Sequence, residues 1–346
     1  MDFSHARQMD KERGNPFHEG HSLSASQLTD ILRQGAGTLS LSHMPSSALA
    51  LWASHLTEGL KRPVIVITAT DREAAAFAEE IRFFQGPHRT PDPLGRKLLV
   101  FPSRSGHQAQ VLGKMENTAH RLETLWSLKS LNKPFIVVTS VAAVLEKVIP
   151  PTVLMERSEY RVVGETLDLE DFVRRLVAAG YYPTALAEEY GDFSRRGGVL
   201  DMYVPLYAWP VRLEFSGDVL ESIRLFHPGT QRSLASLEEV VVTPASEVIF
   251  DQAARDRARA LLLEDVQRGR LSPSLGNVWL ERLEQGHQPA AFEAVLSVFY
   301  EEPATFFDYL PREAVLLWSD YGELKKALHE TFGAILWDQG RKDGDD

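Results

Sequence analysis

The chain has 346 residues, and its 37 Lys and Arg against 48 Asp and Glu give a net charge of −11. A hydrophobic fraction of 44% beside 25% charged residues is typical of a globular protein and excludes bulk disorder. So acidic a chain is not expected to hold nucleic acid over much of its surface, because such binding depends on many Lys and Arg contacts with phosphates.

Two further features of the sequence limit the cellular compartments in which we expect the protein. The chain has no cysteine, which removes disulfides and thiolate metal sites and fits a reducing compartment. No stretch approaches the ~18 uncharged apolar residues that a membrane-spanning helix needs, and the first residues lack the apolar core of a signal peptide. We therefore expect a cytoplasmic protein with no membrane partner.

Residues 1–24 are polar and rich in His, Gly and charged residues, which predicts a flexible leader. Within it, His18-Glu19-Gly20-His21 has a spacing that some metal sites use. Because this stretch lies outside any periodic segment, a surface loop is the better interpretation, and no metal site is predicted.

Residues 25–151 alternate between apolar strands and amphipathic helices. The run PVIVITA at 63–69 is continuous and β-branched, as a strand buried on both faces requires. Thr70 and Glu73 then form a capping box, which predicts a helix that runs to about residue 84. Further strands are predicted at 38–42, 97–101 and 135–139, and further helices at 46–60, around 115–126 and up to about residue 148. This alternation predicts a parallel sheet covered by helices.

After Pro150-Pro151 the pattern changes, and residues 152–242 predict a smaller α+β domain with an antiparallel sheet. Its one clear helix spans about 169–177, and its strands are predicted at 199–204, 211–215 and 219–226, with Ser216-Gly217-Asp218 as a hairpin turn. From residue 243 onward the sequence predicts a helix at 251–270, a loop-rich stretch, a helix near 289–298 and a strand at 314–318 that is apolar enough to join a buried sheet. Residues 336–346 are expected to be a linker or tail.

Parallel sheets of this kind often bind nucleotides, and a nucleotide site needs a phosphate loop with several Gly and one Lys. The corresponding slot, residues 41–49, has neither, and Pro45 removes one backbone donor. Ser46 and Ser47 in this slot are better interpreted as a helix cap.

The second nucleotide motif would be an apolar strand that ends in two acidic residues, which hold Mg²⁺ and orient water. The strand at 314–318 is followed instead by Ser319 and Asp320, and a lone Asp at a strand end is more typical of a turn. Two independent losses predict a degenerate nucleotide slot, so we expect no catalytic residue, no bound cofactor and no metal.

Two arginines stand out in the acidic chain. Arg196 precedes Gly197-Gly198 at the entrance of a strand, and Arg212 begins the neighbouring predicted strand. Arg forms bidentate pairs with carboxylates and is enriched at protein interfaces. The residues alone favour the alternative, in which each Arg is solvated or paired locally with an acidic neighbour, so a binding role stays open at this point.

Four stretches carry a family resemblance. Residues 188–203 (EEYGDFSRRGGVLDMY), with RLEF at 212–215 and TQRSL at 230–234, resemble the transcription-repair coupling factor (Mfd) family, and less closely the excision-repair protein UvrB. DYLP at 308–311 is similar to both. The resemblance covers about residues 25–335. It implies a degenerate P-loop, UvrB-like α/β domain with a parallel sheet (25–151 and 243–335) and an inserted, smaller α+β domain with an antiparallel sheet (152–242) that binds UvrA.

The resemblance also assigns site residues. Arg196 and Arg212 match the two arginines of the family's UvrA-binding surface, so we expect both to be exposed on neighbouring strands. The third member of that surface is an aromatic residue beside Phe215, at the position that Ser216 holds here. UvrB keeps a working phosphate loop and an acidic pair, whereas the Mfd family has degenerate versions, which agrees with the slots described above.

The implied function is that of a non-catalytic, monomeric UvrA-recruiting module that links stalled RNA polymerase to nucleotide excision repair. In full-length members, RNA polymerase and DNA are bound by downstream domains, and the motor domains use ATP and Mg²⁺. No such domains are found in these 346 residues, so we expect either a fragment of a longer protein or a truncated homologue. The alternatives are an ATP-dependent, UvrB-like helicase fragment and an α/β protein with an unrelated ligand in the old nucleotide cleft.

Overall fold

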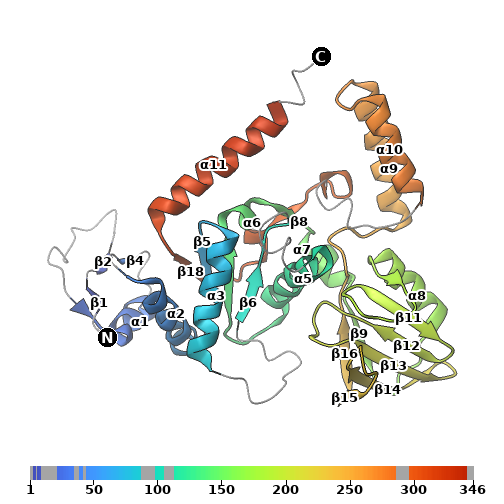
Figure 1. Cartoon of the computed structure of the whole chain (residues 1–346), viewed down its shortest axis with the longest axis horizontal. Helices are drawn as coiled ribbons and strands as arrows, with labels where there is room; N and C mark the ends of the chain where they lie inside the picture. The colour runs from blue at the N-terminus through green and yellow to red at the C-terminus, as the bar shows by residue number, and fades with distance from the viewer. Residues whose placement is uncertain are drawn as a thin grey trace.

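The computed structural model describes residues 3–4, 6–8, 22–34, 39–41, 44–86, 98–104, 113–285 and 296–340. Its larger domain contains a four-stranded sheet in which every neighbouring pair is parallel (Figure 1). The strand order is β18 (Val315–Trp318), β5 (Val64–Thr68), β7 (Ile136–Ser140) and β6 (Leu98–Phe101). The predicted parallel sheet is therefore confirmed, and β5 and β7 are buried along their whole length.

Helices cover both faces of this sheet. Because side chains alternate along a strand, Val64 and Val66 of β5 belong to one apolar cluster and Ile65 and Ile67 to the other. The first cluster includes residues of α1 (Ala25–Arg33), α2 (Ser46–Leu60) and α3 (Asp71–Gln85), and the second includes residues of α5 (Lys114–Ser130) and α6 (Val141–Leu145). Thr70 caps α3 by accepting a hydrogen bond from the Glu73 amide at 3.2 Å, as predicted. The other half of the predicted capping box differs, because the Glu73 carboxylate accepts from the Ala69 amide at 3.3 Å and not from the Thr70 amide.

The structure differs from the prediction at β4 (Leu39–Leu41), which does not join the parallel sheet. It pairs antiparallel with β2 (Ala6–Gln8), and β1 (Phe3–Ser4) pairs with β3 (Ser22–Leu23). The sequence Leu-Ser-Leu is short and lacks the β-branched run of a strand buried on both faces. The motif at 18–21 lies outside the described residues.

Three helices have other lengths or places than predicted. The last helix before the inserted module, α6, ends at Leu145, after which β8 (Lys147–Val148) pairs with β17 (Ala304–Thr305). The stretch predicted to be loop-rich contains α10 (Pro273–Gln285), packed on α9 (Gln252–Gln267). Most of the helix predicted near 289–298 lies outside the described residues. The final helix, α11 (Tyr321–Gly340), runs beyond residue 335, and no described helix is apolar enough over a sufficient length to cross a membrane.

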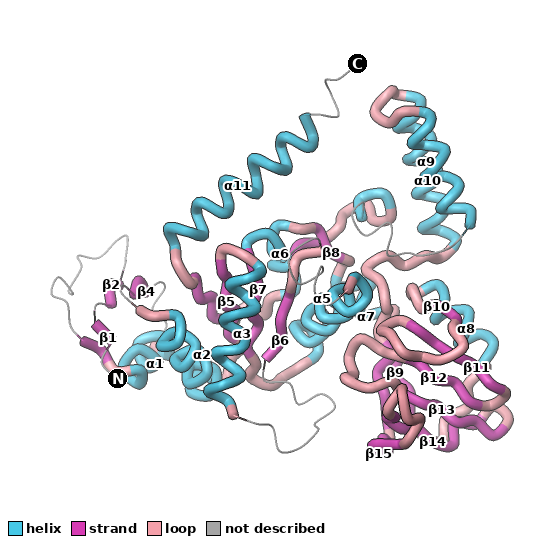
Figure 2. Tube along the Cα trace, viewed as in Figure 1, coloured by secondary structure: helices cyan, strands magenta, loops and turns pink. Residues whose placement is uncertain are grey.

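The inserted region folds around a six-stranded sheet (Figure 2). Its strands lie in chain order: β10 (Tyr182–Pro183), β11 (Asp192–Arg196), β12 (Val199–Met202), β13 (Val211–Ser216), β14 (Val219–Phe226) and β15 (Ser233–Leu237). All pairs are antiparallel except β10 with β11. One sheet face is apolar and packs with the buried side of α8 (Leu169–Ala178), as the predicted α+β domain requires.

The inserted region enters and leaves the larger domain through adjacent segments. After α7 (Pro151–Glu156), strand β9 (Glu159–Val162) pairs antiparallel with β16 (Glu239–Val242), which follows β15. Beyond β16 the chain stays buried through Phe250. The Tyr181 hydroxyl donates to the Thr243 carbonyl at 2.7 Å, so the departing segment is bonded back to the module.

A buried ion network ties this departing segment to the larger domain. Arg121 of α5 is fully buried, and its Nε lies 2.6 Å from Glu247 Oε1 while its Nη1 lies 2.7 Å from Glu146 Oε2. Arg104 adds a second guanidinium, 2.8 Å from Glu247 Oε2. Burial alone would raise the pKa of Glu247, but Arg104 and Arg121 outweigh it and hold that pKa below the ordinary value. Burial raises the pKa of Glu146, against the two arginines.

We expect Glu247→Gln to lower the free energy of unfolding by about 3–5 kcal/mol at neutral pH, because it leaves the Arg121 charge buried without its main partner. Denaturant unfolding followed by circular dichroism measures this. The difference from wild type should shrink as the pH falls below the ordinary glutamate value of 4.5, since the stabilising charge is lost as pH approaches the lowered pKa.

A matched control is Glu284→Gln, which removes the same charge from an exposed pair with Arg259 at 2.8 Å. That variant should cost less than about 1 kcal/mol. Equal effects of the two substitutions would show that the buried network does not hold the domains together.

Candidate functional site

The sequence-predicted arginines lie on one face of the six-stranded sheet. Cross-strand partners share a face, and so do alternate residues along a strand. Arg196 of β11 is opposite Val199 of β12, which is opposite Glu214 of β13, so these three residues share a face. Asp201 lies two residues after Val199 on β12 and is opposite Arg212 of β13, so this pair lies on the same face. We name this surface the arginine face and define it by Arg196, Asp201, Arg212, Glu214, Ser216 and Arg224.

A tight hairpin positions Arg196 at the end of β11. Gly197 has φ of 59°, the left-handed region that favours glycine. A Cβ on Gly198 would lie 2.6 Å from the Phe215 carbonyl oxygen, so glycine is needed for the close approach of β13. Arg196 is exposed, and its Nη2 donates to the Ala185 carbonyl at 2.6 Å. The guanidinium is thus held at the rim of the face with most of its donors open to solvent.

Arg212 has a different environment. Its Nε and Nη2 donate to the two oxygens of Asp201 at 2.6 and 2.8 Å, and Nη2 also reaches Gln231 Oε1 at 2.8 Å. The guanidinium lies over the Phe226 ring, 4.5 Å from its centroid, and the side chain is only 20% exposed. Hydrogen bonding to Asp201 raises the pKa of Arg212 further above its usual value.

Two details of the predicted site are therefore wrong. We expected the two arginines on adjacent strands, but β12 lies between β11 and β13. We also expected Arg212 to be exposed, but Asp201, which the sequence analysis did not single out, already occupies its fork. Asp201 could have been noticed in the sequence as an acidic residue within a predicted strand. To identify it as the partner of Arg212, however, one must know which residues of β12 and β13 are opposite each other.

Phe215 and Ser216 lie on opposite sides of the sheet. A β-bulge shifts the register between Glu214 and Phe215, and Phe215 packs against the apolar core. Ser216 is exposed at the end of β13, opposite Val219, on the same side as Arg212. The face therefore brings together three of the four predicted partner-binding residues, and Phe215 supports it from beneath.

Charge on the rest of the arginine face is locally balanced. Arg224 Nη2 lies 2.9 Å from Glu214 Oε2, and that carboxylate also accepts from the Ser222 hydroxyl at 2.6 Å. The adjacent Arg195 points to the other side of the sheet, where it pairs with Glu170 of α8 at 2.7 Å. Neighbouring arginines on one strand thus serve different faces.

The first half of the predicted nucleotide slot is structural. The N-cap of α2 is Pro45, with no side-chain capping bond, so the predicted serine cap is wrong. Ser46 Oγ instead donates to Glu80 Oε2 on α3 at 2.7 Å, and Ser47 is exposed. Proline has no amide hydrogen and no polar side chain, so it fixes the backbone without capping it.

The second half of the slot lies at the end of β18. The Ser319 amide donates to the Ile67 carbonyl at 3.1 Å, and its hydroxyl is buried without a hydrogen-bond partner in the described part of the chain. Asp320 Oδ1 accepts from the Glu323 amide at 3.1 Å and so caps the start of α11. Among the described residues, no hydrogen bond joins Ser46 or Ser47 to this pair.

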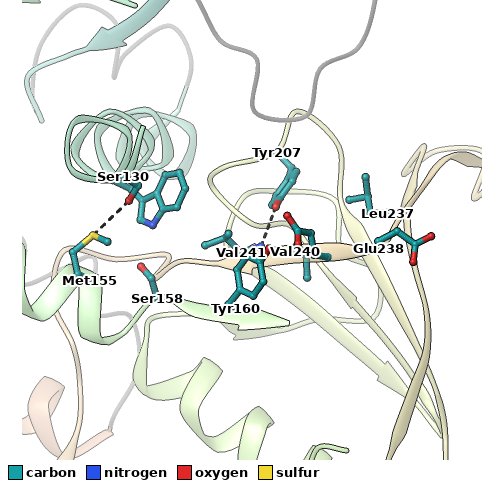
Figure 3. Close-up of a pocket in the computed structure, with 11 residues that line it drawn as sticks. Ser130, Met155, Ser158, Tyr160, Tyr207, Leu237, Glu238, Val240 and Val241 are labelled. Atoms are coloured by element: carbon teal, nitrogen blue, oxygen red, sulfur yellow. Dashed lines mark hydrogen bonds between the residues drawn. The ribbon is translucent and has the colours of Figure 1, made fainter. Parts of the chain in front are cut away.

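A cleft of about 510 Å³ lies where α5 and α7 meet the β9–β16 pair (Figure 3). Its walls include Trp126 and Tyr160, and the Val241 amide donates to the Tyr207 hydroxyl at 3.0 Å. A hydrogen bond to Glu239 raises the pKa of the Tyr160 phenol. The described residues that line the cleft include Ser130 and Ser158 but no histidine. Segments distant in sequence form it, which is why no local pattern predicted it.

The comparison with known protein families distinguishes the inserted region from the rest of the chain. Residues 161–248 match the family model of the UvrB interaction domain. These residues run from β9 through the six-stranded sheet to the departing segment that contains Glu247. In the described residues, no group of three or more metal-ligating side chains is arranged to hold a metal ion.

Three relatives that match most of the chain are all described as transcription-repair-coupling factors. The chain is 32% identical to a transcription-repair-coupling factor of Myxococcus xanthus over 86% of its own length and 24% of the relative. It is 28% identical to the transcription-repair-coupling factor of Bacillus subtilis (strain 168), and 29% identical to that of Mycobacterium tuberculosis, over 83% and 84% of its length. It spans about a quarter of the length of each of these relatives. The resemblance seen in the sequence is thereby confirmed: this chain is similar over most of its length to the transcription-repair-coupling factors, and its inserted module matches the UvrB interaction domain.

Proposed function

We propose that the chain is a non-catalytic module that recruits UvrA through the arginine face, and that it thereby links stalled RNA polymerase to nucleotide excision repair within a transcription-repair coupling factor. The observation that carries the proposal is that the segment matching the UvrB interaction domain is the segment that forms this face. RNA polymerase and DNA would be bound by other parts of the full-length protein, as would ATP and Mg²⁺.

Arg196 is the direct contact in this proposal. Its guanidinium is exposed, makes one bond to a backbone carbonyl, and is held at the rim by a glycine hairpin. A planar guanidinium with open donors suits a carboxylate on the partner. Because little reorganisation is needed to expose it, an acidic group can bind without first breaking an internal ion pair.

Arg212 contributes in a second way. Asp201 holds its fork from one side and Phe226 lies beneath it, so the guanidinium is fixed in direction before any partner arrives. Preorganisation of this kind lowers the entropic cost of binding. The exposed edge of Arg212 and the small side chain of Ser216 then complete the surface beside Arg196.

The prediction for Arg196 uses its neighbour as a control. Arg196→Ala should weaken UvrA binding at least about tenfold, since truncating one member of an interfacial charge pair costs ~2–5 kcal/mol. Arg195→Ala removes the same side chain from the same strand but on the opposite face, and should bind UvrA like wild type. Isothermal titration calorimetry with purified UvrA measures both. Equal affinities of the two variants would place the contact elsewhere.

The Arg212 prediction separates charge from folding. Arg212→Ala alone leaves Asp201, which is 4% exposed, unpaired, so it should lower stability as well as UvrA binding. The double variant Asp201→Asn with Arg212→Gln keeps a neutral hydrogen-bonded pair. It should unfold near the wild-type midpoint while UvrA binding falls. A double variant that is stable and binds UvrA with unchanged affinity would remove Arg212 from the site.

The nucleotide prediction concerns the degenerate slot. We expect no ATP binding by this chain in calorimetry, because no lysine and no glycine stand at 41–49 and only one acid follows β18. Charge-assisted contacts contribute roughly 1.5–3 kcal/mol each, so losing several leaves little affinity. Micromolar ATP binding that Ser46→Ala abolishes would favour the helicase-fragment alternative instead.

A further inference from the structure

The cleft between α5, α7 and the β9–β16 pair has no role in the proposed UvrA contact. Its volume of about 510 Å³ is in the range of ~300–1,000 Å³ that is typical of ligand sites. Its described walls are mostly apolar or aromatic and contain no lysine, arginine or histidine, whereas Glu238 and Glu239 contribute two carboxylates. Neither carboxylate forms an ion pair with another described residue. The negative charge of the cleft is therefore not balanced by its described lining residues.

Aromatic rings accompany this negative charge. Trp126 and Tyr207 are buried in the cleft wall, whereas Tyr160 of β9 is 51% exposed. A hydrogen bond joins the Tyr160 hydroxyl to the Glu239 carboxylate, so an aromatic ring and a carboxylate are neighbours on the ribbon side of the cleft. The face of an aromatic ring attracts a cation, and a carboxylate pairs with one. These neighbours favour a cationic ligand over an anionic or neutral one.

One edge of β16 also faces the cleft (Figure 3). The Val163 amide donates to the Glu238 carbonyl at 2.9 Å, so Glu238 directs its backbone groups toward β9. Backbone groups alternate in direction along a strand of an antiparallel pair, so those of Glu239 point away from β9. The Val241 amide points the same way and donates to the Tyr207 hydroxyl in the cleft wall at 3.0 Å. The Glu239 amide and carbonyl thus lie on the cleft side, where no other described strand pairs with them.

We propose that the cleft binds an extended segment of a partner protein through one arginine side chain. The partner residue opposite Glu239 exchanges two main-chain hydrogen bonds with it, and residues that are directly opposite share a face of the sheet. An arginine at that position places its guanidinium beside the Glu239 carboxylate and the Tyr160 ring, and its aliphatic stem beside Val241. A peptide is favoured over a free organic cation because the site offers main-chain groups as well as charge.

A short peptide tests the proposal directly. The probe is acetyl-Val-Arg-Val-amide, whose β-branched residues favour an extended backbone. Ligand-observed NMR titration with the purified chain at low salt should show saturable binding. The same peptide with glutamine in place of arginine should bind at least about tenfold more weakly, because it lacks the cation. Equal affinities of the two peptides, or no saturable binding of the arginine peptide up to its solubility limit, would overturn the proposal.

Two further ligands separate a peptide from a free cation. The cation n-butylguanidinium carries the arginine side chain without peptide groups, and it should bind at least about fivefold more weakly than the peptide, because it loses two main-chain hydrogen bonds. A peptide methylated on the arginine main-chain nitrogen keeps the cation but cannot donate to the Glu239 carbonyl, and it should also bind more weakly than the unmodified peptide. Binding of n-butylguanidinium as tight as that of the peptide would assign the cleft to a small organic cation and overturn the partner segment.

A matched pair of variants tests the carboxylate. Glu239→Gln should weaken binding of the arginine peptide at least about fivefold, because it removes the charge that pairs with the guanidinium. Glu221→Gln makes the same change at an exposed carboxylate of β14 outside the described cleft lining, and it should bind the peptide like wild type. Equal affinities of the two variants would show that the peptide binds elsewhere.

Tyr160 tests the aromatic contact and links the experiment to the arginine face. Tyr160→Phe keeps the ring and should bind the arginine peptide like wild type, whereas Tyr160→Leu should bind it about two- to fivefold more weakly. A leucine variant that binds as well as the phenylalanine variant would contradict the aromatic contact. UvrA affinity should be the same for all these variants, because none of them changes the arginine face. Failure of peptide binding is therefore distinguishable from failure of the proposed UvrA contact.

Discussion

The buried charge of Arg121 is the constraint on which the arrangement of the two domains depends. A guanidinium without solvent needs carboxylates at hydrogen-bond distance, because an uncompensated buried charge costs several kcal/mol. Its two acidic partners come from opposite sides of the inserted module: Glu146 precedes it in the chain and Glu247 follows it. The charge can be satisfied only when the chain has gone through the whole module and come back. Correct closure of the insertion and burial of this network are therefore one event.

The same pairing chemistry has another role on the arginine face. Asp201 and Arg212 form a bidentate pair like those at the junction, but at the surface, with one edge of the guanidinium open to solvent. There the carboxylate fixes the direction of a side chain instead of joining two domains. Arg196, two strands away, has only a carbonyl partner and keeps its donors available. The sheet thus offers one arginine that is free to bind and one that is fixed in place.

Strong local patterns made much of the fold predictable. The β-branched runs of β5 and β7, the Thr70 cap and the hairpin at Gly217 each depend on neighbouring residues, and each was found where expected. Helix α10 was missed because Gly276 is usually a helix breaker. Here a Cβ on Gly276 would come within 2.3 Å of Val266 Cγ2, so the glycine permits α9 and α10 to pack closely.

The site was less predictable because its geometry is set by register. Arg196 and Arg212 could be singled out by their sequence context, but their separation by β12 and the capture of Arg212 by Asp201 depend on which residues pair across strands. No pattern within a few residues carries that information. The same holds for the cleft in Figure 3, whose walls come from segments far apart in the sequence.

The paired strands β9 and β16 have a mechanical consequence. The chain enters and leaves the module through this ribbon, with Glu159 beside Val242 at the end nearer the larger domain. Tension between a molecule held on the sheet and the larger domain would pull both strands in the same direction. Their mutual hydrogen bonds run across the direction of pull, so the strands share the load and are not peeled apart. The force is then resisted by the segment that follows β16. There the Tyr181 hydroxyl is hydrogen-bonded to the Thr243 carbonyl, and Glu247 is paired with the buried guanidinium of Arg121.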